Sequence, residues 1–413
     1  MSKLGQVCSF AARLYYGRGQ IAYYGYVRRE PVALLNLRPG RVDPYPVYDR
    51  LRKRGKLTPS RLGNWVTTSH PVCDAVLRDR RFGVRPESPV NAAAREQFDL
   101  SFLELNPPDH TRLRKLASPA FTPRAIAGYT DRITRTVNDL LDASPGGFDL
   151  VSDFATPLPI AVITDLLGVP DANSDDFARY GMAVGSALDG IKSLTHAREL
   201  MYASTRLRAM FAELIKERRR DPRDDLISQL VAAEGERITA DEIVPMCSLL
   251  LVAGFETTVN LIGNATLSLL AHPDEWKALC ADPETMAPRA VEETLRYDPP
   301  VQRTVRVALE PLEIAGLPVR KNQLVLTLIG AANRDPEVYE DPDTFSLHRE
   351  NPAPHLAFSG GIHYCIGAPL ARLEATIALR ALAERMPGLT RTGPMRLRRG
   401  ATLRGPLHLP VSP

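Results

Sequence analysis

Cys365 lies in the segment FSGGIHYCIG, which leads into APLARLEATIALRAL, a run that favours a helix. A thiol in this setting could be a buried side chain, a nucleophile or a metal ligand. A nucleophile needs a neighbouring base, and His363 lies two positions away, on the same face of an extended chain. A lone protein ligand to a metal needs a cofactor that supplies the others, as a tetrapyrrole does with four nitrogens. The segment by itself leaves nucleophile and metal ligand open.

The residues that follow Cys365 favour its thiolate form. We expect a helix from Ala368, with Pro369 in its first turn, where proline is tolerated. A cysteine at a helix N-terminus faces the positive end of the helix dipole and unpaired amides, which lower the thiol pKa. Gly361 and Gly367 lack side chains, so the backbone there is expected to lie on the face of a flat ligand.

Glu256 and Thr257 are polar residues in the otherwise apolar run VPMCSLLLVAGFETT. They could be a tolerated polar spot in a core helix. Alternatively, Gly254 permits close approach of a ligand, and the Thr257 hydroxyl bonds back to a carbonyl one turn earlier, which opens the helix. Such a groove could hold dioxygen and a water, and the acid and alcohol would deliver the two protons that splitting O₂ needs.

Two pairs of residues share helix faces. Glu293 and Arg296, at i and i+3, would at the surface be an ion pair worth a few tenths of a kcal/mol. His110 and Arg114, at i and i+4, are able to grip a carboxylate together. Taken singly, each of these residues could equally be an ordinary surface or core residue.

The elements that must position these residues are mainly helices. Thr239 and Glu242 fit a capping box and open a helix that ends near His272, about 45–50 Å long. Residues 82–106 are irregular and form a candidate mobile loop. Residues 301–335 alternate and are rich in Val, Leu and Thr, which predicts a small β region. The fold class is therefore mainly α with a smaller β region, in one domain.

Composition excludes several classes of protein. The chain has 413 residues, a net charge of +4 and 44% hydrophobic residues, which argues against a dedicated nucleic-acid binder. Its five cysteines are scattered and contain no CxxC pair, which argues against a disulfide framework and a structural zinc site.

Residues 1–42 form a basic, tyrosine-rich N-terminal extension. Arginines interrupt its apolar stretches, so it lacks the continuous apolar core of a signal peptide. We expect a short helix on the domain or a frayed end, with at most weak contact between residues 1–30 and a membrane surface. The longest apolar run elsewhere is shorter than the ~20 residues of a spanning helix, so no transmembrane anchor is predicted.

The pattern Phe358-x-x-Gly361-x-x-x-Cys365-x-Gly367 resembles the haem-binding signature of the cytochrome P450 family. The resemblance implies that Cys365 is the proximal iron ligand and that Phe358 shields its sulfur. Bacterial members usually carry glycine where this chain has Ser359. A serine is tolerated there provided that the position does not need a positive φ.

Three further motifs occur upstream in the family's order. Glu256 and Thr257 resemble its oxygen-activation acid and alcohol, the catalytic residues. Glu293-Thr-Leu-Arg296 matches its ExxR element, a buried structural pair; Thr344 stands where a third partner, Arg, is common, so Arg349 or backbone is expected to substitute. His110 and Arg114 resemble its His-x-x-x-Arg propionate clamp, and Arg306 and His363 match its other propionate donors. The cofactor-binding residues that the resemblance implies are Cys365, His110, Arg114, Arg306, His363, Phe358, Gly361, Gly367, Ala253 and Gly254.

The resemblance covers about residues 43–410 and implies a single catalytic domain, residues 43–413, with the cytochrome P450 fold: a triangular helical prism with a long central helix and small sheets. It implies a bacterial, cytoplasmic haem-thiolate monooxygenase that holds haem b. Such an enzyme inserts one oxygen atom of O₂ into an apolar organic substrate by hydroxylation or epoxidation. The chain has no Rossmann or flavin motif, so electrons from NAD(P)H are expected through a separate ferredoxin and ferredoxin reductase.

The alternatives are a peroxide-driven peroxygenase on the same fold, a non-catalytic haem carrier or gas sensor, and a colourless cysteine hydrolase. An acidic ferredoxin is expected to dock on Arg112, Lys115 and Arg372. The expected walls of the substrate pocket are mostly apolar, with Arg81 and Arg303 as exceptions, and comprise residues 82–105, 175–200, 248–257 and 299–305.

Overall fold

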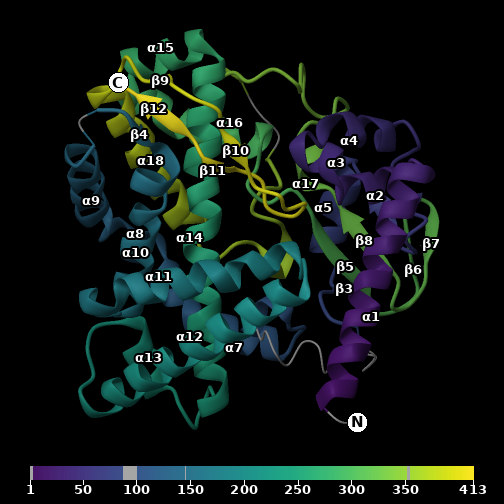
Figure 1. Ribbon diagram of the computed structural model, residues 1–413, viewed down its shortest axis with the longest axis horizontal. Helices are drawn as coiled ribbons and strands as arrows, with labels where there is room; N and C mark the ends of the chain where they lie inside the picture. Colours follow the sequence, from purple (N-terminus) through teal and green to yellow (C-terminus); the bar gives the residue numbers. More distant parts are fainter. Residues whose placement is uncertain (1–2, 87–99, 145, 351–353) are drawn as a thin grey trace.

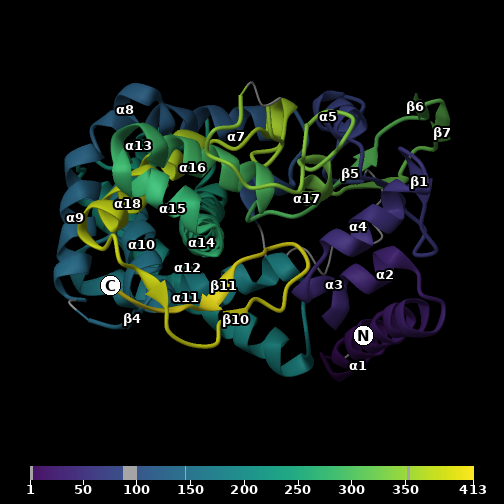
Figure 2. The same ribbon diagram turned by 90° about the horizontal axis from the view of Figure 1, so that it is seen from above.

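The computed structural model describes residues 3–86, 100–144, 146–350 and 354–413. Figure 1 shows most helices on one side of the molecule, around the upright α14, with the largest sheet and the N-terminal helices on the other side. Figure 2, seen from above, separates the same two parts. The predicted fold class, mainly α with a smaller β region, is confirmed.

Helices account for most of the described chain. The α-helices are α1 (Lys3–Ala22), α2 (Pro31–Leu35), α3 (Arg38–Val42), α4 (Tyr45–Arg52), α5 (His70–Arg78), α7 (Asp109–Ala117), α8 (Pro123–Ala127), α9 (Thr130–Asp142), α10 (Pro157–Leu167), α11 (Asp171–Gly185), α12 (Leu194–Arg220), α13 (Leu226–Ala232), α14 (Ala240–Ala271), α15 (Pro273–Ala281), α16 (Pro283–Tyr297), α17 (Ile329–Ala332) and α18 (Ala368–Arg385). Short 3₁₀ or π turns lie at Tyr23–Val27, Ser101–Glu104, Ser118–Phe121, Leu150–Ala155, Ser186–Asp189 and Gly361–His363.

The long central helix is α14, which has 32 residues and is therefore about 48 Å long. The predicted capping box is present: the Thr239 side chain and the Glu242 side chain bond each other's backbone amides. α14 packs against α10, α11, α12, α16 and α18. Because helices surround it, α14 is apolar on nearly every face, and the polar residues within it need a particular explanation.

The sheets are small. The largest has the strand order β1-β2-β8-β5-β3, in which only β2 and β8 run parallel. β5 contributes Arg306 opposite Val325 of β8. The strands are β1 (Thr58–Pro59), β2 (Trp65–Thr67), β3 (Phe82–Gly83), β4 (Phe148–Asp149), β5 (Thr304–Ala308), β6 (Leu312–Ile314), β7 (Leu317–Val319), β8 (Leu324–Thr327), β9 (Thr390–Arg391), β10 (Arg396–Leu397), β11 (Pro406–His408) and β12 (Pro410–Ser412).

Two helical segments of the described chain, Leu150–Leu167 and Ala240–Ala271, are long and apolar enough to cross a membrane by composition. Their apolar windows are 67% and 83% buried in the fold. Both segments therefore pack in the core. The predicted mobile loop at 82–106 lies mostly outside the described residues, apart from its ends.

The N-terminal extension folds as helices rather than as a frayed end, with α1, α2 and α3 separated by a π turn and short links. Arg18 of α1 donates to the carbonyl oxygen of Lys192, in the link between α11 and α12. Tyr15, Tyr16 and Tyr26 are more than half exposed. The extension therefore lies on the domain beside the link that precedes α12.

Candidate active site

The Cys365 loop leads into α18, which begins at Ala368 with Pro369 in its first turn, as predicted. The Cys365 amide donates to the carbonyl of Phe358 at 2.9 Å and closes the loop. The Phe358 ring is buried, and the Arg372 guanidinium lies 4.6 Å from its centre. The loop thus holds Cys365 and Phe358 as one unit.

The Cys365 side chain is open on one side, but dense protein surrounds the rest of it. This burial raises the pKa of the thiol above its ordinary value. The amides of Gly367 and Ala368 and the Arg114 charge lower the pKa, but by less. The predicted lowering is therefore wrong for the protein alone, and a bound metal ion would have to displace the proton.

Two glycines of the loop, Gly361 and Gly367, are required for different reasons. Gly361 has a φ of 63°, and a Cβ there would lie 2.5 Å from the carbonyl oxygen of Leu77 in α5. Gly361 is thus required by the backbone of α5, and contact of its backbone with a flat ligand stays a prediction. At Gly367 the nearest atom to an added Cβ is the Cys365 sulfur, at 4.0 Å, so Gly367 leaves open space beside the thiol.

Ser359 has a φ of 63°. The condition under which serine would be harmless is therefore not met, because this left-handed conformation favours glycine. Arg306 Nη2 donates to the Ser359 hydroxyl oxygen at 3.2 Å. The serine thus adopts a strained backbone conformation, and its hydroxyl accepts a hydrogen bond from a buried arginine.

The open face of α14 is formed by Ala253, which is exposed, and Thr257, which is half-buried. The Thr257 hydroxyl donates to the Ala253 carbonyl at 3.1 Å, the predicted bond one turn back. A Cβ at Gly254 would lie 2.8 Å from the Ile163 side chain of α10. Gly254 therefore serves the contact between α14 and α10, whereas Ala253 and Thr257 are the residues placed to meet a ligand.

The carboxylate of Glu256, next to Thr257 in the chain, points away from the open face of α14 and toward Arg398. Glu256 is 3% exposed, and Arg398 Nη1 lies 2.6 Å from its carboxylate. Arg398 Nε also donates to the Asn260 side chain at 2.9 Å. Burial raises the pKa of Glu256 more than Arg398 lowers it, and Glu256 Oε2 has no partner among the described residues. Arg398 was missed from sequence because it lies far along the chain in no motif.

The four predicted propionate donors meet in one cluster. The rings of His110 and His363 lie 4.3 Å apart between centroids. Arg114 donates to the Tyr364 carbonyl, and Arg306 contacts Ser359. No carboxylate of the described residues forms an ion pair with either arginine.

This cluster is electrostatically unbalanced. Burial and the Arg114 and Arg306 charges lower the pKa of His110 to about 4, and the pKa of His363 is lowered to about 3 by burial and these neighbours. Burial alone lowers the pKa of Arg306 to about 10. Both His110 ring nitrogens and His363 Nε2 are buried without a partner among the described residues. A ligand with carboxylates beside Cys365 would satisfy them, so the residues fit haem and its two propionates.

The pair Glu293–Arg296 is buried and bidentate, with contacts of 2.8 and 2.7 Å. Arg296 also donates to the carbonyls of Pro342 and Thr344, at 2.8 and 2.9 Å. Arg349 Nε lies 3.4 Å from the Glu293 carboxylate. Both expected substitutes for the third partner, Arg349 and backbone, are therefore present.

Two of the three predicted docking residues are engaged within the protein. Arg112 bonds Asp109 and Glu242, and Arg372 bonds Glu292 at 2.6 Å. Lys115 is exposed. The predicted docking surface is thus less basic than the sequence indicates.

Comparisons with known proteins agree on one family. The family model described as cytochrome P450 matches residues 188–385. The biotin biosynthesis cytochrome P450 of Bacillus subtilis is 40% identical over 84% of this chain and 90% of its own length. The 6-deoxyerythronolide B hydroxylase of Saccharopolyspora erythraea is 38% identical over 90% of this chain and 96% of its own.

Solved structures give the same result. The ligand-free CYP164A2 of Mycobacterium smegmatis superposes with a TM-score of 0.86 and 43% identity, over 93% of this chain and 99% of that one. P450BioI, solved with an acyl carrier protein ligated to hexadec-9Z-enoic acid, gives 0.85 and 38%, over 91% of this chain and all of that one.

Proposed function

The chain belongs to the cytochrome P450 family and is a haem-thiolate monooxygenase, and we propose that Cys365 is its iron ligand and that its substrate is an apolar organic molecule, oxidised at a C–H or C=C bond. The observation that carries the assignment of the site is the unbalanced cluster of His110, His363, Arg114 and Arg306 beside the only cysteine in a glycine-rich loop. We propose residues 43–413 as one catalytic domain and 1–42 as its extension.

Haem b, when bound, supplies the iron at which O₂ is reduced and cleaved. The two arginines and two histidines would hold its carboxylates, since charge-assisted hydrogen bonds to carboxylates are strong. Ala253, which is exposed on the open face of α14, offers apolar surface to the ring or substrate. The protein thus orients the reactants and excludes water.

Thr257 and Glu256 move protons in this proposal. The Thr257 hydroxyl lies on the open face of α14 and donates to the Ala253 carbonyl, so its oxygen can accept a hydrogen bond from a ligand there, and it can donate to a ligand only after it leaves that carbonyl. Burial raises the pKa of Glu256, so its unpartnered Oε2 takes up a proton more readily than the oxygen of an exposed carboxylate would. Arg398 holds the other carboxylate oxygen, so delivery from Glu256 requires its side chain to turn away from Arg398. Arg398 therefore sets how readily the acid is released.

Electrons come, in this proposal, from NAD(P)H through a ferredoxin and its reductase, and the enzyme acts in the cytoplasm. The ferredoxin would meet the exposed Lys115 first, and Arg112 and Arg372 would contribute only their unshared donors. Charge reversal at Lys115 should slow electron transfer, and an unchanged rate would remove this surface from the proposal.

The absorption spectrum of the reduced CO complex tests the core of the proposal. The haem-loaded protein should show the red-shifted thiolate Soret band, and Cys365→Ser should keep the fold, by circular dichroism, and lose the band. A wild-type protein without the band would contradict the proposal. Turnover with peroxide but not with reduced ferredoxin would favour the peroxygenase instead.

A further inference from the structure

The first helix, α1, turns a row of uncharged residues toward solvent. Five exposed residues follow one another at steps of three or four positions, the spacing of one helix face: Cys8, Ala12, Tyr15, Gly19 and Tyr23. Tyr16 lies beside this row, which we call the outer stripe, and is 69% exposed. A helix on a protein surface normally turns polar residues outward, so the outer stripe needs an explanation.

Another face of α1 packs on the protein. Phe10, Leu14 and Ile21 share that face and are half-buried, and α1 packs against α2 and the π turn that follows it. Arg18 donates to the carbonyl oxygen of Lys192. The contact of α1 with the rest of the molecule therefore does not use the outer stripe.

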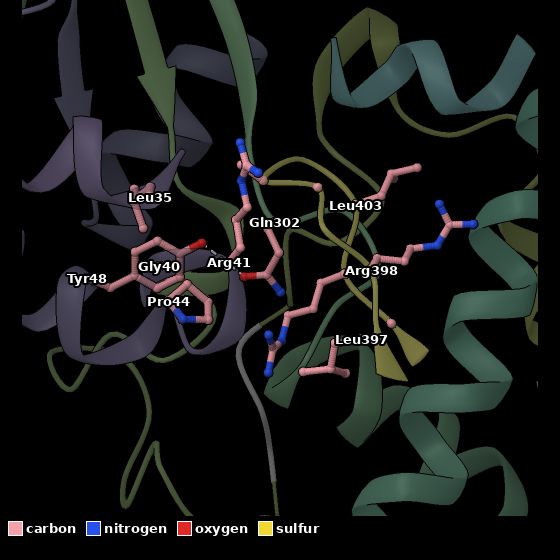
Figure 3. A pocket seen from close by; sticks show the side chains of 13 residues that line it. Leu35, Gly40, Arg41, Pro44, Tyr48, Gln302, Leu397, Arg398 and Leu403 are labelled. Carbon is pink, nitrogen blue, oxygen red and sulfur yellow. Dashed lines mark hydrogen bonds between the residues drawn. The ribbon is translucent and has the colours of Figure 1, made fainter. Parts of the chain in front are cut away.

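The extension behind α1 is closely fitted to the domain. Figure 3 shows Leu35 and Tyr48 on one side of a cavity and Arg398 of the C-terminal loop on the other. The cavity has a volume of about 10 Å³, room for about one water molecule. Arg404 Nη1 also donates to the Val42 carbonyl at 3.0 Å. The extension is thus fixed on its inner side, and Figure 2 shows α1 at the outer edge of the molecule.

The charges around the outer stripe all have one sign. Residues 1–29 contain no Asp or Glu, although the whole chain has 48 acidic residues in 413. Arg13 and Arg18 lie on opposite sides of the stripe, each about 100–120° from its middle around the helix. Arg28 and Arg29 follow the π turn, and all four arginines are exposed. Cations therefore flank the stripe, and the surface that fits it carries negative charge.

The charges also decide between two ways of covering the stripe, by a second copy of the chain or by a membrane surface. In a symmetric dimer the same surface of both copies meets, so the arginines of the two copies would repel each other. A membrane surface with anionic lipid attracts them instead. Tyrosine, with its apolar ring and polar hydroxyl, is enriched at the level of the lipid headgroups. The tyrosines and arginines together thus favour lipid.

We propose that α1 lies flat on the surface of a membrane that contains anionic lipid, with the tyrosines of the outer stripe among the headgroups and the flanking arginines on the phosphates. The helix has 20 residues and is therefore about 30 Å long. Its arginines keep it at the surface rather than across the bilayer. Binding is reversible and weakened by salt, because much of the attraction is electrostatic. This docking is independent of the chemistry at Cys365.

Co-sedimentation with lipid vesicles tests the proposal on the haem-loaded protein. One set of vesicles is phosphatidylcholine alone, and the other contains an equal amount of phosphatidylglycerol. Stained gels measure the bound protein, so the result does not depend on the haem. We expect the anionic vesicles to bind at least about tenfold more tightly than the neutral ones, and about 0.5 M salt to remove most of this preference.

Two sets of substitutions separate the contributions of charge and aromatic rings. The triple variant Arg13→Gln, Arg28→Gln, Arg29→Gln should bind anionic vesicles about a hundredfold more weakly, about fivefold for each arginine. Tyr15→Ser with Tyr23→Ser should weaken binding without changing its dependence on salt. Melting temperatures verify that each variant is folded, which is expected because the substituted side chains are exposed.

The matched control removes three exposed arginines on the other side of the molecule (Figure 1): Arg124→Gln in α8, Arg135→Gln in α9 and Arg391→Gln in β9. It changes the net charge equally and should bind as the unsubstituted protein does. Equal binding to both kinds of vesicle, or an equal loss in the control, would overturn the proposal. A dimer in light scattering that dissociates in the tyrosine variant would also overturn it, because the stripe would then be covered by a second copy.

Discussion

The ExxR cluster (Glu293, Arg296 and Arg349) and the propionate cluster (His110, Arg114, Arg306 and His363) both contain buried arginines. They differ in how the charges of these arginines are balanced. Arg296 has two carboxylate contacts and carbonyl partners. Arg306 has only neutral partners, of which the Ser359 hydroxyl is one. Charges that stabilise the fold are thus completed by the chain itself. The arginines that would bind a ligand have no carboxylate partner among the described residues, and such buried, unpaired charges mark the site.

The largest effect should come from Arg296→Met, which leaves the Glu293 carboxylate buried with only its weaker partners. Removing one member of a buried ion pair typically costs about 3–5 kcal/mol. We expect a loss of this size in the free energy of unfolding of the apoprotein, measured by urea denaturation. A loss below about 1 kcal/mol, the value of a surface pair, would show that the cluster is not structural.

Arg306→Gln should have the opposite pattern of effects, with little change in stability and a clear change in haem binding. The apoprotein should lose little stability, because an unpaired buried cation is removed, whereas haem should dissociate about tenfold faster, the size of one charge-assisted hydrogen bond. Transfer of haem to apomyoglobin measures the rate. Destabilisation as large as that of Arg296→Met would mean that Arg306 holds the fold instead.

His110 gives the propionate cluster a pH dependence. Its pKa is about 4 in the folded protein, below its ordinary value, so the unfolded chain binds more protons between the two. Apoprotein stability should therefore fall as the pH falls through this window. His110→Gln should make the fall shallower in urea titrations at several pH values. An unchanged slope would contradict the burial of an unprotonated His110.

The smallest effect belongs to Ser359. Ser359→Ala keeps the left-handed strain and loses the bond to Arg306, whereas Ser359→Gly loses the bond but relieves the strain. The glycine variant should therefore be more stable than the alanine variant by about 1 kcal/mol, measured by thermal unfolding of the apoprotein. Equal stabilities would show that the backbone at this position carries no strain.

The sequence predicts the parts of the site that depend on local spacing. The helix of Glu256 and Thr257, the helix start after Cys365 and the Glu293–Arg296 pair follow from neighbours along the chain. The reason for Gly361 did not, because the atom that requires it is a carbonyl of α5. The contact of Arg398 with Glu256 was equally hidden, since it joins segments far apart in the chain and belongs to no motif.

The sign of φ at Ser359 shows a different limit. Serine is compatible with most backbone conformations, so its presence argued for an ordinary one. The tertiary structure overrides that preference because the loop must turn between Phe358 and Cys365. A residue type indicates which backbone conformation is preferred, whereas closure of the loop can require another one.

All partners of the charged residues in the ExxR cluster come from the chain itself, which has a consequence for how the enzyme is assembled. Arg296 and Arg349 bind carbonyls of residues 340–344, and none of these bonds involves the cofactor site. We therefore expect the chain to reach a folded, receptive apoprotein before haem arrives. In cells, the yield of coloured enzyme would then follow the supply of haem more closely than the success of folding.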